Sequence, residues 1–168
     1  MREIKVQKLD QKKFAKYGEF QNLLDDAALA EKSLFPYGFF ADVVKLDFAA
    51  TTLPTISVCQ VKKQEKNIIS LLEAHKFTCE GLLPLDDDVI IFTGTPLPGK
   101  KFSVETVEAF YVPKGTFVKL NPLVLHGTQF PVSEGTAHVV CMLPGRTFMN
   151  DMLAEPLPEE ERAIIVME

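Results

Sequence analysis

The chain has 168 residues, 46% of them hydrophobic and 24% charged, which is the composition of one globular domain and excludes a disordered or fibrous protein. A formal net charge of −5 gives no broad basic surface, so we expect no nucleic-acid partner. No uncharged run approaches the ~20 residues needed to span a bilayer, and residues 1–5 alternate charged with apolar side chains, so we expect a cytoplasmic protein without membrane association.

The N-terminal part predicts a short strand and two helical segments. Residues 4–6 alternate apolar with polar side chains, which is typical of a strand. Asp10 can cap a helical turn that runs through Phe14 and ends at Gly18. From residues 20–34 the apolar side chains recur at helical intervals, which predicts the only sizeable helix of the chain.

Beyond residue 38 the sequence pattern becomes that of a β-protein. Short runs rich in β-branched and aromatic residues alternate with turn residues at a spacing of roughly 8–12 residues, which favours a sandwich, barrel or jelly roll. The predicted strands are residues 39–44, 55–58, 67–72, 81–83, 88–92, 107–112, 116–120, 123–126 and 136–142. The acidic stretch 149–161 predicts a segment on the surface, and 163–166 predicts an edge strand or a subunit contact.

Neither an internal repeat nor a linker divides the chain, so we expect one domain over residues 1–168. It would consist of an N-terminal strand and helical segment (1–35), a β-barrel (36–148) and a C-terminal extension (149–168). Three cysteines, Cys59, Cys79 and Cys141, lie in apolar or mixed segments. Their odd number favours buried reduced thiols over a disulfide framework, which indicates a reducing compartment.

Two of the three histidines lie in settings that a catalytic or metal site would use. On an extended strand Glu73 and His75 project to the same face, and a turn over residues 76–78 would return Glu80 to the same cavity. His126 could enter the barrel from another strand. These four residues form a mixed nitrogen and oxygen ligand set that would suit Mn, Fe, Ni or Zn. Without a metal they could act as general acid and base, and the alternative is that they are strand-end residues facing water.

Other polar residues have weaker signals. Lys119 and Arg146 could bind a substrate carboxylate, for which Arg offers two parallel hydrogen bonds, although each could equally be a solvated surface charge. His138 alternates with apolar residues and is predicted to pack at the rim of the barrel. The three consecutive aspartates at 86–88 predict a solvated turn and not a calcium site.

Four segments, residues 9–19, 73–75, 81–85 and 107–126, share motifs with one known family. Residues 9–19, with a Leu, a Phe and a Tyr-Gly pair followed by an acidic residue, resemble the opening of the ureidoglycolate lyases, a family of the cupin superfamily. The Glu-Ala-His element at 73–75, followed by the apolar-Pro run at 81–85, resembles the Glu-x-His strand of the family and the strand after it. Residues 107–126 resemble the later half, in which a strand precedes a histidine at the mouth of the barrel.

The resemblance implies a mainly β protein, a cupin-type double-stranded β-helix (jelly roll) with short N-terminal helices that forms a homodimer. It also implies a carbon–nitrogen lyase that cleaves a small-molecule substrate, ureidoglycolate, to glyoxylate and urea. For that reaction we assign the acid and base roles to His75 and His126, orientation to Glu73, and metal ligation or hydrogen bonding to Glu80. Two alternatives remain, a metal-dependent sugar isomerase or epimerase in the same barrel and a cupin that binds a small ligand without chemistry.

Overall fold

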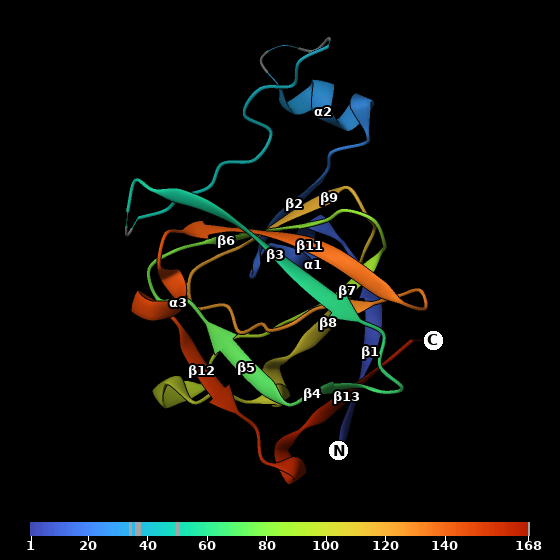
Figure 1. Cartoon of the computed structure of the whole chain (residues 1–168), viewed down its shortest axis with the longest axis vertical. Coiled ribbons are helices and arrows are strands. Elements are labelled where there is room, and N and C mark those ends of the chain that lie inside the picture. The colour runs from blue at the N-terminus through green and yellow to red at the C-terminus, as the bar shows by residue number, and fades with distance from the viewer. Residues whose placement is uncertain (34, 36–37, 50, 168) are drawn as a thin grey trace.

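The computed structural model describes residues 1–33, 35, 38–49 and 51–167, and it is built mainly of strands (Figure 1). The helices are α1 (Gln11–Phe14), α2 (Asp26–Lys32) and α3 (Thr147–Asn150), with 3₁₀ turns at Pro98–Lys100, Val104–Thr106 and Glu159–Glu161. The strands are β1 (Arg2–Lys8), β2 (Gly18–Asn22), β3 (Pro54–Lys62), β4 (Asn67–Ile69), β5 (Leu71–Ala74), β6 (Glu80–Pro84), β7 (Val89–Thr93), β8 (Glu108–Val112), β9 (Thr116–Leu120), β10 (Phe130–Pro131), β11 (Thr136–Pro144), β12 (Leu153–Pro156) and β13 (Ala163–Val166).

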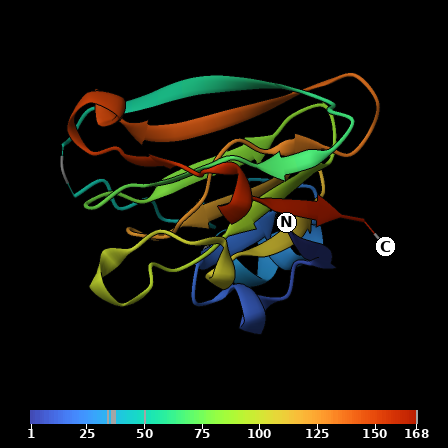
Figure 2. The same ribbon diagram turned by 90° about the horizontal axis from the view of Figure 1, so that it is seen from below.

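Two sheets and a ribbon form the body of the molecule. One sheet has six strands in the order β10-β7-β8-β1-β13-β4, the other has five in the order β2-β9-β6-β11-β3, and β12 pairs with β5 in a two-stranded ribbon. Figure 2 shows β3 and β11 side by side in an upper layer, with the other strands curving beneath them. Among the described residues, no helix is long and apolar enough to cross a membrane.

The strand β7 shows why the apolar runs fold into this arrangement. Its five residues are all buried, because successive side chains point to opposite faces and both faces are covered. Ile90 and Phe92 pack into one apolar cluster, whereas Val89 and Ile91 pack into the other. A strand that is covered on both faces requires a continuous apolar run, and residues 89–92 provide it.

The two ends of the chain lie in the same sheet. The N-terminal strand β1 runs parallel to β8 on one side and to β13 on the other. The strand predicted at 163–166 is present as β13, but it pairs with both β1 and β4 and is therefore interior. The prediction of an edge strand is wrong there, because two sequence-distant neighbours cover both of its sides.

Most strand predictions are confirmed, and the N-terminal cap is confirmed as well. The carboxylate of Asp10 accepts hydrogen bonds from the backbone N–H groups at the start of α1. The predicted run 67–72 is divided into β4 and β5 at Ser70, and the predicted run 136–142 extends to Pro144 as β11. These elements were predictable because the alternation of apolar residues and the turn residues that bound it both lie within the same short segment.

Three element predictions are wrong. The helix predicted at 20–34 begins only at Asp26, because the residues before it pair with β9 as β2; residue 34 lies outside the described residues. Residues 39–44 form turns and bends instead of a strand, with Asp42 at a positive φ of 57°. Residues 123–126 form no continuous strand, because Leu123 has a φ of 64°.

The pairing of β2 with β9 requires a glycine at its first residue. A Cβ at Gly18 would lie 1.8 Å from the backbone oxygen of Lys119, and only a shift of one strand could relieve the clash. We expect Gly18→Ala to lower the free energy of unfolding by about 3 kcal/mol or more, measured by urea denaturation. Gly135→Ala is the control, because φ is +108° there but nothing lies within 4 Å, so only backbone strain of about 1 kcal/mol is added. Equal losses in the two variants would contradict the steric argument.

Candidate functional site

The barrel interior contains a polar cluster that comes from three separate parts of the chain. His75 follows the last residue of β5, and Glu80 is the first residue of β6. His126 is joined to Glu73 of β5 by two backbone hydrogen bonds of 2.9 Å, which makes the two residues an antiparallel pair. Paired residues in antiparallel strands place their side chains on the same face, so Glu73 and His126 both face this interior.

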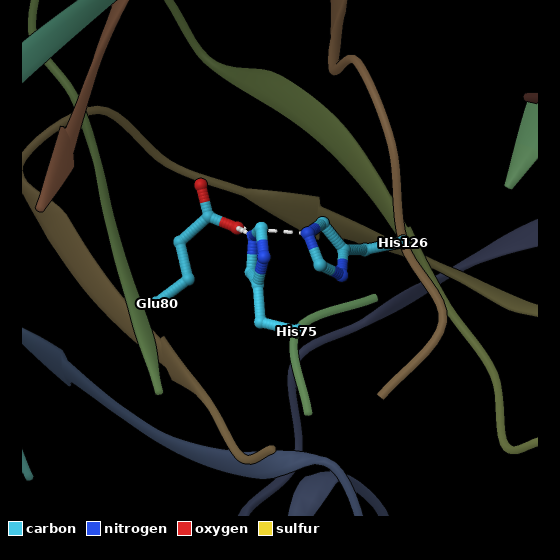
Figure 3. Close-up of side chains that lie close together, drawn as sticks. All are labelled: His75, Glu80 and His126. Atoms are coloured by element: carbon cyan, nitrogen blue, oxygen red, sulfur yellow. Dashed lines mark ion pairs between the residues drawn. The ribbon is translucent and has the colours of Figure 1, made fainter. Parts of the chain in front are cut away.

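The side chains of His75, Glu80 and His126 point toward one another (Figure 3). The Oε2 atom of Glu80 lies 2.8 Å from Nε2 of His126 and 3.4 Å from Nε2 of His75. All three residues are buried, with exposures of 3% for His75, 6% for Glu80 and 4% for His126. Glu73 Oε1 lies 3.8 Å from Nε2 of His126, and the side chain of Glu73 is 19% exposed. Glu73 therefore lies on the more open side of the cluster.

Backbone carbonyl groups fix the orientation of both imidazoles. Nδ1 of His75 lies 2.8 Å from the carbonyl oxygen of Asp151, and Nδ1 of His126 lies 2.9 Å from that of Val124. A carbonyl oxygen only accepts hydrogen bonds, so each Nδ1 carries a proton and donates it. This leaves each Nε2 directed at Glu80. The same arrangement orients histidines that bind metals in proteins.

Two of the converging atoms lack a hydrogen-bond partner. Glu80 Oε2 and His126 Nε2 form an ion pair of 2.8 Å, but this contact does not have hydrogen-bond geometry, and neither atom has a hydrogen bond to another described residue. A buried polar atom without a hydrogen bond costs about 1–3 kcal/mol. The ligand atoms of the three residues lie within 4.8 Å of one another. This spacing and donor set fit a divalent cation bound at about 2.0–2.2 Å from each atom after small adjustments.

The electrostatics of the cluster separate Glu73 from Glu80. Burial opposes the charge of Glu80, but the neighbouring imidazoles outweigh it and lower the pKa of this carboxyl to about 2. Burial likewise opposes the charge of His126, but Glu80 and then Glu73 raise the pKa of its imidazole to about 9. At Glu73 burial dominates and raises the pKa of the carboxyl. A carboxyl group with a raised pKa is a stronger base and suits proton transfer, whereas the ionised Glu80 suits the binding of a positive charge.

The structure does not bring Lys119 and Arg146 into this cluster. Lys119 on β9 forms an ion pair of 2.8 Å with Glu19, the residue opposite it on β2. Arg146 is exposed and has a positive φ of 65° just before α3. It lines a cavity of about 410 Å³ that also includes Asp151, whose carbonyl holds His75. Arg146 therefore shares a cavity with Asp151 that none of the four cluster residues lines, and Lys119 is paired with Glu19.

His138 and the aspartates at 86–88 lie outside the cluster. The Nδ1 atom of His138 is 2.6 Å from Asp86 Oδ2, and both side chains are largely exposed. Asp87 and Asp88 accept hydrogen bonds from Ser133 and from the backbone of Lys114, respectively. These aspartates therefore stabilise the neighbouring segments by accepting hydrogen bonds from backbone N–H groups.

The sequence pattern missed several residues next to the cluster. Asp151 lies in the stretch that was predicted as a plain surface segment, yet it is 7% exposed and contacts His75. Cys141 is buried, and burial followed by the charge of Glu80 raises the pKa of its thiol to about 12. Burial, followed by the charge of Glu73, raises the pKa of Cys59. Their positions in β11 and β3 follow from the alternation of each strand, but their proximity to the glutamates depends on long-range pairing. All three cysteines are free thiols.

No family model matches the chain, and no curated protein matches it. Similar solved structures include a dTDP sugar isomerase from Desulfovibrio desulfuricans G20, with 13% identity, a TM-score of 0.47 and coverage of 70% of this chain and 73% of that one. RmlC from Streptococcus suis in complex with dTDP-D-xylose has 15% identity, a TM-score of 0.42 and coverage of 57% and 46%. QdtA, a sugar 3,4-ketoisomerase from Thermoanaerobacterium thermosaccharolyticum in complex with TDP, has 16% identity, a TM-score of 0.36 and coverage of 64% of each chain.

The structure is mainly β, with a six-stranded and a five-stranded sheet and few short helices, which confirms the predicted mainly β fold class. No comparison supports the predicted membership of the ureidoglycolate lyase family. The prediction of a ureidoglycolate lyase is wrong, because the similar solved structures are described as sugar isomerases and epimerases and not as lyases. The short motifs at 9–19 and 73–85 therefore do not determine the reaction.

Proposed function

We propose that this protein is a metal-dependent isomerase or epimerase of a small sugar-like hydroxycarbonyl compound. The observation that carries the proposal is the convergence of three buried ligand atoms, two of which, Glu80 Oε2 and His126 Nε2, have no hydrogen-bond partner among the described residues. His75 completes the set with its Nε2 atom, 3.4 Å from Glu80. Buried polar atoms without a hydrogen bond are costly, and a cation bound between these two atoms would interact with both.

His75, Glu80 and His126 would hold the cation. Two imidazoles and one carboxylate suit Mn, Fe, Ni or Zn, and three protein ligands leave coordination positions open for a substrate. When bound, a divalent cation supplies a Lewis acid that polarises the carbonyl group of the substrate. The three side chains are held in place by the barrel, and the two histidines are also held by the carbonyl groups that accept from Nδ1.

Glu73 is placed to move the proton. Its Oε1 atom lies 3.8 Å from His126 Nε2, and its side chain is the most exposed of the four. The Glu73 carboxylate takes the proton from the carbon next to the carbonyl. The electron pair of the broken C–H bond forms the carbon–carbon double bond, and the carbonyl π pair moves onto the carbonyl oxygen, which gives an enediolate. An isomerisation is completed when the hydroxyl proton passes to that oxygen and Glu73 returns its proton to the former carbonyl carbon, whereas an epimerisation is completed when water protonates the original carbon on its other face.

Arg146 is assigned to substrate binding. Arg146 and Asp151 line the same cavity, and a guanidinium group has five N–H donors that can bind a carboxylate or phosphate group in two parallel hydrogen bonds. The substrate would then have an anionic group at one end and a hydroxycarbonyl group at the other. We assign no role to Lys119, whose charge is compensated by Glu19.

The substrate is not identified, so the proposal is tested on a panel of compounds. The measured quantity is the deuterium that each compound takes up from the solvent. Protein loaded in turn with Mn²⁺, Fe²⁺, Ni²⁺ or Zn²⁺ is incubated in D₂O with aldoses, ketoses, their phosphates and sugar acids, and deuterium incorporation is followed by NMR and mass spectrometry. We expect incorporation at the carbon next to the carbonyl of one compound class, loss of exchange after chelator treatment, and recovery when the cation is restored. A cation-loaded protein that exchanges no proton and converts no compound of the panel would overturn the assignment as an isomerase or epimerase.

A further inference from the structure

Asp151 is bonded to three consecutive residues of the segment that carries His75. Its carbonyl oxygen accepts from Nδ1 of His75 at 2.8 Å. Its carboxylate accepts from the backbone N–H of Lys76 at 2.7 Å and from that of Phe77 at 3.0 Å. One residue therefore holds both the imidazole of His75 and the turn that follows it.

The strand register brings Asp151 to this place. β12 pairs with β5 so that Leu153 lies opposite Ala74, and continuing the same register places residue 151 opposite residue 76. The short helix α3 ends immediately before it, and the backbone N–H of Asp151 donates to the carbonyl oxygen of Thr147 at 2.8 Å. The ring of Phe148 packs edge-on against His75, with ring centres 6.4 Å apart. The contact with His75 is thus part of the docking of the C-terminal segment.

We infer that Asp151 is a positioning residue of the polar cluster, which fixes the ring of His75 with its Nε2 atom directed at Glu80. A neutral imidazole has one donor and one acceptor nitrogen, so a carbonyl at Nδ1 places the free electron pair on Nε2. The carboxylate of Asp151 holds its own backbone against residues 76 and 77, which keeps that carbonyl at the correct distance. That Nε2 of His75 binds a cation rests on the proposed function, whereas the orientation of the ring does not.

The variant Asp151→Asn tests this role with almost no change in size. Its amide keeps one acceptor oxygen, but the NH₂ group would face a backbone N–H of Lys76 or Phe77, so one hydrogen bond is replaced by a contact between two donors. We expect the backbone of residue 151 and its carbonyl to move away from His75. A second variant, Asp151→Ser, keeps one short acceptor and introduces no NH₂ group. We expect its carbonyl at residue 151 to move less than in Asp151→Asn.

Asp87→Asn is the matched control. The carboxylate of Asp87 likewise accepts from two backbone N–H groups, those of Asp88 and Ser133, in the turn between β6 and β7. Asp87→Asn therefore removes the same kind of hydrogen bond, from a backbone N–H to a carboxylate in a turn, at a residue that does not contact His75. A purely structural role for Asp151 predicts that the two Asn variants differ only in urea stability.

The first measurement uses metal-free protein labelled with ¹⁵N-histidine. In the parent and in Asp87→Asn, we expect an NMR signal for the Nδ1 proton of His75 that is protected from exchange with water. In Asp151→Asn we expect exchange at least about 10-fold faster or loss of the signal, because the acceptor has moved. A parental Nδ1 signal in folded Asp151→Asn would overturn the inference.

The second measurement is cation affinity by competition with a chelator, using Zn²⁺ and Mn²⁺ alone. We expect affinity to fall by about 10–100-fold in Asp151→Asn, the usual effect of losing an outer partner of a metal-binding histidine, and to be unchanged in Asp87→Asn. Unchanged affinity in both variants would overturn the positioning of a ligand by Asp151. If the parent binds no cation while the His75 proton behaves as expected, the proposed function fails and the orientation of His75 by Asp151 stands.

Discussion

The variant His126→Asn is expected to lose stoichiometric cation binding while the barrel remains folded. The amide nitrogen of Asn can occupy the place of Nδ1 and still donate to the carbonyl oxygen of Val124, but no atom replaces Nε2. Only two of the three converging ligands then remain. Protein purified without chelator or affinity metal should contain about one cation per chain in the parent by elemental analysis. Affinity should fall by roughly 100-fold or more in the variant, beyond the effect of losing an outer partner.

His138→Asn is the matched control, since His138 is the remaining histidine of the chain and pairs with Asp86 at the surface. It should keep the parental cation content. Urea unfolding of both variants separates the loss of a ligand from the loss of the fold, because His126 is buried whereas the side chain of His138 is 39% exposed. Parental cation content in folded His126→Asn would show that the cation binds elsewhere, and the proposed site would be rejected.

The sequence pattern was sufficient for elements that have their period within a short segment. β7 is a continuous apolar run bounded by turn residues, and β11 alternates buried with partly exposed residues along most of its length. β2 was not predictable in the same way. Its few residues precede the helix α2 directly, and the apolar positions of the two together fit a helical period. Pairing with β9 overrides that local preference, and the pairing cannot be inferred from β2 alone.

The same distinction explains which parts of the site were predictable. Glu73, His75 and Glu80 lie within the short segment 73–80, so strand parity and a turn were enough to predict their proximity, although β5 and β6 belong to different sheets. The entry of His126 was proposed from a strand that does not exist. The residue is held instead by a single bridge to Glu73, because the positive φ of Leu123 interrupts the extended run.

The position of Asp151 could not be predicted from its own surroundings. The stretch 149–161 is acidic and contains two prolines, which is typical of a solvated surface segment. β12 pairs with β5 through backbone hydrogen bonds, which do not depend on the side chains. Its four residues are mostly exposed, so they show no clear alternation of apolar and polar side chains. A buried carboxylate next to His75 arises only from that register. Long-range pairing, and not local composition, therefore completes the site.

Glu73→Gln is expected to abolish most of the proton exchange while the cation content stays at the parental level. Glu73 is not among the three converging ligand atoms, so the cation keeps its ligands. The amide has nearly the same size and cannot accept a proton from carbon. Loss of a positioned base lowers the rate by about 10²–10⁴-fold. Deuterium incorporation and elemental analysis on the same preparation measure both quantities.

Glu155→Gln is the control for a change of charge near the site. Glu155 lies on β12 opposite Leu72, next to the residue that pairs with Glu73, and its side chain is exposed. It should exchange protons at the parental rate. A parental exchange rate in Glu73→Gln would exclude Glu73 as the base. Loss of the cation together with exchange would instead make Glu73 a fourth ligand, and the proton would then have to be moved by another group. The two measurements together therefore distinguish a base from a ligand at the one carboxylate of the cluster that is open to substrate.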